Sequence, residues 1–467
     1  MPRFPAPRAA FAALLLAATL VRPAPAAAHT RLQSSSPHDR ETVGDTLRTI
    51  RLRFSEAVAP AMSMLELSMY DSVVVSGAMA VGAEGDAKVL EFALPGALDP
   101  GTYRVSWHAA SADGHVIRGS FRFLVVETTP SSPVASSLVA AQDAPAADEQ
   151  AAGGDEEAES DAARPLPVAV RWAEFLALLG MIGAVAFNLL VVRRVRGGEG
   201  MERIADRAAY GAWHLALAAA ALSLLTLLAR LWLQSAELNG PDQAFDGEMM
   251  RALLTGTVWG SGWILQAVGT VAYFLGLMVA RAPHGRSTGW MGAAVAALLL
   301  AAVPALSGHA AAEEKATAVA IASDWLHVLG AGVWLGTLAT VMLAGLPAAA
   351  FAHEGEGTAG FARMVAAFSP VALAGAGTAG VTGVVSALFH ITAVGDLWNT
   401  SYGVMLLIKL ALLGIVAAIG FHNWRTVLPS LHASESPTRL RRTAAAELAT
   451  GVVVVLVTAI LVALPPP

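Results

Sequence analysis

Eight long apolar segments dominate the chain from residue 165 to its end. Each has at least about 20 residues, the length that an α-helix needs to cross the hydrocarbon core of a bilayer. A helix also satisfies its backbone hydrogen bonds internally, as any segment in lipid must. The pattern therefore predicts an all-α polytopic membrane domain of eight transmembrane helices over residues 165–467. The segments are 165–192, 207–234, 258–281, 288–308, 318–346, 364–390, 402–424 and 443–464.

A different pattern covers residues 29–127. Short segments of alternating apolar and polar residues, such as 46–54, 65–70 and 103–108, are separated by turn residues. Alternation with a period of two is typical of half-buried strands, and several short strands at this spacing indicate an antiparallel β-sandwich or barrel. We therefore expect a small β-domain ahead of the helices.

Residues 128–164 fit neither pattern. They consist mainly of Pro, Ser, Ala and Gly with a run of acidic residues, and their first basic residue is Arg164. Such a composition cannot bury enough apolar surface to order the chain, so we expect a disordered acidic linker. A solvated spacer is the simpler interpretation, and a weakly cation-attracting arm is the alternative.

Residues 1–28 have the three parts of a secretory signal peptide. Arg3 and Arg8 precede an apolar run at 9–21, and an A-x-A cleavage site follows at Ala26 and Ala28. The apolar run is shorter than a membrane span, which favours cleavage after Ala28 over an uncleaved anchor helix. Export of the β-domain follows from this interpretation.

The loops between the predicted helices indicate an orientation. Arg-rich loops, such as the one with Arg193, Arg194 and Arg196, alternate along the chain with loops dominated by Asp and Glu. Lys and Arg are retained on the cytoplasmic side of a membrane. Together with export of the N-terminus, this bias predicts a multi-pass protein of the bacterial inner membrane. Its N-terminal domain and its C-terminus would both lie on the periplasmic side.

The composition narrows the chemistry. The chain is 55% hydrophobic and 14% charged, with a formal net charge of -6, so it lacks the basic surface that binds nucleic acid. We expect the lipid bilayer as a partner and no nucleic acid. The chain contains no cysteine, which excludes disulfides and thiolate metal sites. His, Met, Asp, Glu and backbone groups are the metal ligands that remain.

A candidate metal site begins at the predicted cleavage point. Cleavage after Ala28 would make His29 the first residue of the mature chain. Its free α-amine and its Nδ1 can chelate one cation, and such donors suit the tetragonal geometry of Cu(II). In the motif at 111–115, Asp113 and His115 would point to the same side of an extended chain. A surface turn is the alternative for this motif alone, but paired with His29 it becomes part of a candidate Cu(II) site.

Several short sequences in residues 29–126 also carry a family resemblance. They are His29, Ser34-Ser35-Ser36-Pro37, Leu52-Arg53-Phe54-Ser55-Glu56, Gly101-Thr102-Tyr103-Arg104-Val105-Ser106-Trp107, Ser111-Ala112-Asp113-Gly114-His115 and Gly119-Ser120-Phe121. This set resembles the CopC family of periplasmic copper-binding proteins. The resemblance implies a Greek-key, cupredoxin-like β-sandwich. It also implies a Cu(II) site formed by the N-terminal amine and His29, with His115 and Asp113 as further ligands.

Some members of that family carry a methionine-rich Cu(I) site as well. The candidates here are Met62, Met64 and Met69, and alternation along a strand would put Met62 and Met64 on one face. Methionine is also an ordinary core residue, so packing is the alternative for all three.

Polar residues inside the predicted spans are costly in lipid and therefore mark candidate functional sites. His309 ends the fourth span, Asp324 and His327 open the fifth on one helical face, and His390 ends the sixth. The predicted topology places all four at the same outer membrane face, where they form a candidate metal-receiving site. Caps of helix ends at the interface are the alternative, and both interpretations stay open.

Two further charges lie inside predicted spans. Glu174 belongs to the first span and Lys409 to the seventh, and both fall in the outer half of the membrane. We expect a structural ion pair between them.

The membrane part carries a second resemblance. The matching residues are Ser307-Gly308-His309-Ala310, Asp324-Trp325-Leu326-His327, Gly332-Val333-Trp334-Leu335-Gly336, Phe368-Ser369-Pro370-Val371-Ala372 and Thr400-Ser401-Tyr402-Gly403, followed by Lys409 and Asn423. They resemble the CopD family of integral copper-transport or copper-resistance proteins. The chain thus looks like a natural CopC-CopD fusion.

These expectations combine into a copper-handling protein that is not an enzyme. The β-domain would capture Cu(II) and present it to the membrane histidines for import, with Cu(I) as an open alternative during transfer. Periplasmic copper chaperones or a reductase are candidate partners. Three other functions stay open at this point: copper resistance by periplasmic sequestration or efflux, a copper-dependent oxidase or oxygenase, and a haem- or copper-dependent membrane redox protein.

Overall fold

A computed structural model describes most of the β-domain and the helical region. The described residues are 30–70, 72–82, 85–111, 116–127, 165–239, 245–282, 286–307, 317–351, 356–391, 393–423, 425 and 436–464. They divide into two compact units. One unit holds the β-domain together with residues 227–265, and the other holds residues 171–226 and the chain from 266 onward.

Several predictions fall outside the described residues. These are the signal peptide at 1–28, the acidic linker at 128–164, and the candidate ligands His29, Asp113, His115 and His309.

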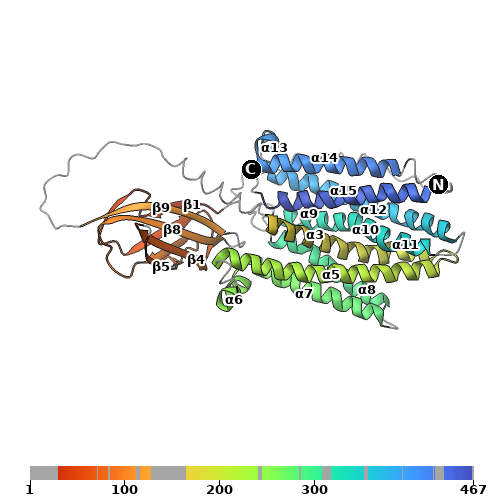
Figure 1. Ribbon diagram of the computed structural model, residues 1–467, viewed down its shortest axis with the longest axis horizontal. Helices are drawn as coiled ribbons and strands as arrows, with labels where there is room; N and C mark the ends of the chain where they lie inside the picture. Colours follow the sequence, from red (N-terminus) through yellow and green to blue (C-terminus); the bar gives the residue numbers. More distant parts are fainter. Residues whose placement is uncertain are drawn as a thin grey trace. The chain divides into compact units, whose positions relative to one another are not determined.

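The β-domain is a sandwich of two sheets, which confirms the predicted fold class. The four-stranded sheet has the order β1-β3-β7-β6 and the five-stranded sheet the order β2-β9-β8-β4-β5, with β9, β8 and β4 visible side by side in Figure 1. All pairs are antiparallel except β2 with β9, which is parallel and which the sequence pattern did not predict. The strands are β1 (Leu32–Ser36), β2 (Thr42–Gly44), β3 (Thr49–Phe54), β4 (Val58–Met69), β5 (Ser72–Ala78), β6 (Ala80–Val81), β7 (Val89–Ala93), β8 (Gly101–Ser111) and β9 (Val116–Val126).

Strand β3 shows why the alternating pattern forms a sandwich. Ile50, Leu52 and Phe54 are completely buried, while the residues between them face outward. Phe54 meets Trp107 of the opposite sheet edge-on, with ring centroids 5.4 Å apart. Full burial of such a side chain contributes roughly 1.5–3 kcal/mol, so this face holds the two sheets together.

The helical region confirms the eight predicted spans. By length and composition, eight of the described helices can cross a membrane. In Figure 1 these long helices run alongside one another. The candidate spans are Pro165–Arg196, Glu202–Leu238, Trp259–Arg281, Arg286–Leu306, Ala318–Ala350, Gly357–Phe389, Ser401–His422 and Arg441–Leu461.

Some spans consist of several consecutive helical segments. The described elements are α3 (Pro165–Ala186), η1 (Phe187–Val192), α4 (Arg193–Arg196), α5 (Glu202–Asn239), α6 (Gly247–Gly256), α7 (Val258–Arg281), α8 (Arg286–Ser307), α9 (Thr317–Ala331), η4 (Gly332–Gly336), α10 (Thr337–Thr340), η5 (Val341–Gly345), α11 (Leu346–Ala350), α12 (Glu356–His390), α13 (Asp396–Asn399), α14 (Ser401–His422) and α15 (Ser436–Leu461). The η segments are π-helical turns, which often occur at functional sites in longer helices.

Glycines allow the first and fifth spans to approach very closely. A Cβ added to Gly183 would lie 2.0 Å from the carbonyl carbon of Gly336, and one added to Gly336 would lie 1.9 Å from the carbonyl oxygen of Leu179. No side chain fits at that distance, so backbone packs directly on backbone. Contacts between small residues of this kind are the usual means of helix association in lipid.

Candidate metal centres

The start of the described chain is fixed to one edge of the sandwich. The Thr30 hydroxyl donates to Oε2 of Glu56 at 3.2 Å, and Thr30 is only 6% exposed. The backbone N–H of Arg31 donates to Oγ of Ser55, and the backbone N–H of Ser55 donates to the carbonyl of Arg31, both at 2.9 Å. The residues that follow His29 are therefore held at the turn between β3 and β4.

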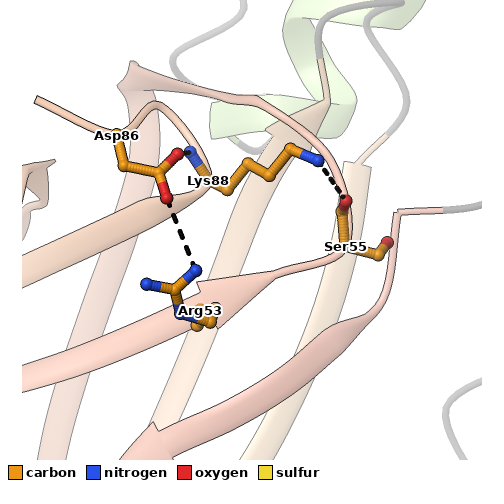
Figure 2. Close-up of polar contacts among 4 residues, drawn as sticks. All are labelled: Arg53, Ser55, Asp86 and Lys88. Carbon is orange, nitrogen blue, oxygen red and sulfur yellow. Dashed lines mark hydrogen bonds and ion pairs between the residues drawn. The ribbon is translucent and has the colours of Figure 1, made fainter.

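Ser55 is held from its other side as well, as Figure 2 shows. Its carbonyl accepts from Nζ of Lys88 at 3.0 Å, while the backbone N–H of Lys88 donates to Oδ1 of Asp86 at 2.9 Å. Arg53 completes the group with a contact of 3.4 Å to Oδ2 of Asp86. Exposed pairs of this kind each contribute little to stability. Together these contacts fix the position of the turn to which the backbone of Arg31 is hydrogen-bonded.

Strand β8 ends at Ser111, just before the motif with Asp113 and His115, and reaches the same end of the domain. Ser111, the last residue of β8, pairs with Val58 at the start of β4. Val58 lies two residues after Glu56, the acceptor of the Thr30 hydroxyl. Two segments that are far apart in sequence thus meet at one end of the sandwich. The three candidate ligands next to them are not described, so their grouping stays a prediction.

The structure does not bring the three methionines together. The register of β4 against β8 shifts between Ala59 and Met64, and this irregularity interrupts the alternation from which Met62 and Met64 were expected on one face. Met62 is buried beside Leu238, whereas Met64 is 37% exposed. Met69 packs against the sandwich core, and it lies five residues beyond Met64 on the regular part of β4, which is roughly 16 Å at about 3.3 Å per residue. One ion cannot contact all three.

His108 has neighbours on both sides that its place in the sequence does not reveal. This residue pairs with Met64 of β4 on one side and with Arg118 of β9 on the other. Burial, and then the charge of Arg118, hold the pKa of His108 below its ordinary value. The imidazole therefore stays neutral at neutral pH. Only the strand pairing, which the spacing of residues does not reveal, could have identified these neighbours.

In the membrane region the structure assembles a polar group that we call the Asp324 cluster: Asp324, His327, Thr382 and Ser386. Asp324 and His327 lie one turn apart on α9, and the other two lie on α12. The Ser386 hydroxyl donates to Oδ1 of Asp324 at 2.8 Å. It thereby fixes the carboxylate of one helix to its neighbour.

The orientation of the His327 ring follows from its partner. Nδ1 lies 2.9 Å from the carbonyl oxygen of Ala379 and 3.3 Å from the hydroxyl of Thr382. A carbonyl can only accept, so in the neutral ring Nδ1 carries the proton and Nε2 keeps its lone pair. A histidine that donates one N–H to a carbonyl in this way has the usual arrangement of a metal ligand. Gly383 leaves room for the ring, because a Cβ there would lie 3.1 Å from Cε1 of His327.

Of the four predicted membrane ligands, the structure thus brings Asp324 and His327 together. His390 is the last residue of α12, four residues after Ser386, and His309 is not described. Among the described residues, no three His, Asp or Glu side chains gather closely enough to hold a metal ion. The described half of the candidate site supplies one imidazole and one carboxylate.

Lys409, which was expected to pair with Glu174, also interacts electrostatically with a carboxylate of the Asp324 cluster. Asp324 attracts the ammonium of Lys409, and the same ammonium lies within electrostatic range of the His327 ring. Asp324 also interacts electrostatically with Tyr402, which lies two turns before Lys409 on α14. Glu174, the expected partner, is buried in the first span. The similar membrane depth of Lys409 and Asp324 was the signal that could have suggested this neighbourhood.

A second polar cluster surrounds Glu447 of α15. Nδ2 of Asn423 donates to Oε2 of Glu447 at 3.4 Å, and the Trp334 indole donates to the same carboxylate. Oδ1 of Asn423 is buried and has no partner among the described residues. All three residues come from different helices, so the cluster ties η4, α14 and α15 together.

Comparison with known proteins agrees with this architecture. Residues 32–126 match the model of the CopC domain, residues 161–319 that of the copper resistance protein D-like N-terminal domain, and residues 362–461 that of copper resistance protein D. A sandwich of CopC type followed by helices of CopD type defines the class: a polytopic membrane protein with a copper-binding extramembrane domain. The chain belongs to the copper resistance and copper transport proteins that join CopC and CopD in one polypeptide.

One relative matches nearly the whole chain, and others match only its β-domain. Copper transport protein CutJ of Bacillus subtilis is 26% identical over 458 residues, which cover 97% of this chain and 77% of the relative. Copper resistance protein C of Xanthomonas campestris pv. juglandis is 35% identical over 119 residues, 24% of this chain and 91% of that protein. The crystal structure of CopC from Methylosinus trichosporium OB3b aligns with 28% identity and a TM-score of 0.21, covering 22% of this chain and all 100% of that one.

Proposed function

We propose that this protein captures Cu(II) at its β-domain on the periplasmic side and transfers it to the Asp324 cluster for import across the inner membrane. The capture site would consist of the N-terminal amine and His29, with Asp113 and His115 as further ligands. The placement of Thr30 and Ser111 at one end of the sandwich supports this grouping. The names of the relatives, a copper transport protein and copper resistance proteins, support copper as the cargo.

The observation that carries the membrane half of the proposal is the tautomer of His327. Its proton is directed at the Ala379 carbonyl, and the carboxylate of Asp324 is held one turn away by Ser386. An imidazole nitrogen and a carboxylate oxygen are ligands that copper accepts. His309 and His390 would complete the site. Copper can change oxidation state before it reaches these ligands, and a reductase or a copper chaperone would then be a partner.

The composition of residues 128–164, which predicts a flexible acidic linker, favours transfer over storage. Two sites joined by such a linker would meet at an effective concentration on the order of millimolar, without any added affinity at either site. A protein that only sequesters copper gains nothing from such a connection.

The capture site is tested by electron paramagnetic resonance of Cu(II) bound to the mature chain. One extra residue placed ahead of His29 moves the free amine away from the imidazole, so we expect a changed spectrum and weaker binding. An unchanged spectrum and affinity would refute the N-terminal chelate.

The direction of transport is tested in cells by copper content. Deletion of the gene should lower internal copper at limiting supply, and His327→Ala in the restored gene should have the same effect. His214→Ala is a matched control, because His214 is exposed on α5 and its Nδ1 contacts the carbonyl of its own helix at Tyr210. Higher internal copper on deletion would replace import by resistance through sequestration or efflux.

A further inference from the structure

Two aromatic rings hold the side chain of Arg281 at the end of a membrane helix. Arg281 is the last residue of α7 and of the third candidate span, and it is exposed. Its guanidinium carbon lies 5.2 Å from the ring centroid of Tyr210 and 5.1 Å from that of Trp213, both on α5. A cation at this distance from a ring is attracted to its face, so the two rings orient the guanidinium.

The Trp213 ring is fixed by a hydrogen bond. Its Nε1 donates at 2.9 Å to the carbonyl of Leu277, which lies one turn before Arg281 on α7. Tyr210, in contrast, is 51% exposed. The stack of Arg281 on the two rings thus rests on a fixed contact between α5 and α7, while Arg281 and Tyr210 stay accessible.

The charge of Arg281 is not balanced by a described carboxylate. The nearby Asp206 on α5 already accepts from two other arginines, Arg196 at 2.6 Å and Arg286 at 2.9 Å, both at Oδ1. Glu202, the first residue of α5, lies one further turn away from the two rings. The Arg281 guanidinium makes no ion pair with any residue that the structure describes. Its N–H donors are therefore free for a ligand.

The depth of this stack fits the headgroup region of a bilayer. A candidate span ends at Arg281, and Trp and Tyr concentrate at the two membrane interfaces. Phe274 and Met278 lie seven and three residues before Arg281, on the same face of α7, and each is 36% exposed. A ligand with an anionic head and apolar chains would meet a cation first and apolar surface beneath it.

We propose that Arg281, Tyr210 and Trp213 form a binding site for the phosphate group of an anionic phospholipid. The guanidinium donates charge-assisted hydrogen bonds to phosphate oxygens, and the Tyr210 hydroxyl adds a further donor. The faces of the two rings keep the planar guanidinium in place, which a lysine ammonium could not match. The site does not depend on copper. The charge bias of the loops predicts it for the cytoplasmic leaflet, which carries anionic lipids.

The test is native mass spectrometry of the purified full-length chain after removal of bound lipid. Phosphatidylglycerol, which is anionic, and phosphatidylcholine, which has no net charge, are titrated separately. The parent should bind phosphatidylglycerol more tightly, and Arg281→Gln should reduce this preference by roughly fivefold or more. Tyr210→Leu keeps the charge but removes one ring and its hydroxyl, so it should reduce the preference by a smaller factor.

A matched control separates this site from overall charge. Arg251→Gln removes one positive charge from an exposed residue of α6, a helix outside the candidate spans. It should leave the preference for phosphatidylglycerol unchanged. An equal loss in Arg251→Gln and Arg281→Gln would show that only overall charge matters, and would refute the site.

The remaining outcomes decide whether the ligand is a lipid. A parent without preference for phosphatidylglycerol, or an Arg281→Gln variant that keeps the full preference, would refute the proposal. Inorganic phosphate at millimolar concentration should leave bound phosphatidylglycerol in place, because it lacks the apolar chains. If inorganic phosphate displaces the lipid from the parent, and binds the lipid-free parent but not Arg281→Gln, the site takes soluble phosphate and the assignment to a phospholipid fails.

Discussion

The β-domain and the membrane region present candidate copper ligands in opposite ways. In the β-domain, the predicted ligands belong to a chain terminus and a loop, and the structure shows the rigid turn of Ser55 and Glu56 next to them. In the membrane region, Asp324 and His327 lie one turn apart on the regular helix α9, and the neighbouring helix α12 holds each one directly. Ligands on a terminus and a loop are suited to capture, whereas the Asp324 cluster is fixed by helix packing. Changes to packing should therefore affect the two regions separately.

The two regions also pack differently. Large side chains such as Phe54 and Leu52 fill the sandwich, whereas the first and fifth spans meet through Gly183 and Gly336. The hydrophobic effect drives the first kind of packing, but lipid offers no such force between helices. Substitution by a smaller side chain should lower the stability of the sandwich most. Substitution by a larger side chain should lower the stability of the helical region most.

The largest effect is expected from Phe54→Ala in the sandwich core. Removal of a completely buried aromatic ring should lower the free energy of unfolding of the β-domain by about 3–5 kcal/mol. Scanning calorimetry of the full-length chain should show an earlier β-domain transition and an unchanged membrane transition. Val74→Ala, at a residue that is 48% exposed on β5, is the control and should change stability by less than about 0.5 kcal/mol. Equal shifts in both transitions would show that the two regions unfold together.

Gly336→Ala tests the opposite kind of packing. The new methyl group would overlap the carbonyl of Leu179, so the two spans must separate, at a cost of about 1–3 kcal/mol. The membrane transition should fall while that of the sandwich stays in place. Gly377→Ala is the matched control, because a Cβ at Gly377 meets nothing within 4 Å. A variant as stable as the control would contradict the close approach of the two backbones.

The contrast between these regions was partly visible in the sequence. Apolar length alone predicted all eight spans, because lipid leaves a segment of that length few alternatives to a helix. The alternation in β3 was equally direct, since each buried position faces the core. Short edge strands such as β2 and β6 carry too few residues for a period to be detected. The irregular register of β4 before Met64 depends on pairing with β8, which local sequence does not encode.

The candidate sites, like the fold, were predictable from sequence only where local spacing determines them. The spacing of Asp324 and His327 on one helical face was readable from sequence, because a single helix determines it. The Ser386 hydroxyl that donates to Asp324 belongs to another helix, and only the packing of α9 against α12 brings the two residues together.

Ser386→Ala tests how strongly helix packing positions a ligand. Without the hydroxyl, the Asp324 carboxylate loses a hydrogen bond to a charged group, which should weaken copper binding at the Asp324 cluster by roughly tenfold. The measurement is a copper titration of the purified full-length chain carrying His115→Ala, which disables the proposed capture site. Ser369→Ala is the control, because Oγ of Ser369 donates to the carbonyl of Val365 within its own helix. Equal affinities for the two variants would show that Ser386 does not position the carboxylate.

The smallest effect is expected from His108→Gln in the β-domain. Burial and Arg118 lower the pKa of His108 in the folded state, so the unfolded chain binds more protons once the pH falls below about 6.5. The free energy of unfolding of the wild-type domain should therefore decrease as the pH drops below that value, and glutamine should remove this part of the decrease. Urea unfolding at about pH 7.5 and about pH 5 measures it. An identical acid sensitivity in both chains would show that His108 does not contribute.

The fixed start of the β-domain has a consequence for how the protein is made. Proteolytic cleavage concentrates at exposed, poorly ordered termini and loop tips, where the backbone is not already buried and bonded. In the finished fold, Thr30 is buried and the backbone of Arg31 is bonded to Ser55. If the predicted cleavage after Ala28 takes place, it would have to come before this edge of the sandwich folds. A chain that folded first would keep the predicted leader and would not form the proposed N-terminal chelate at His29.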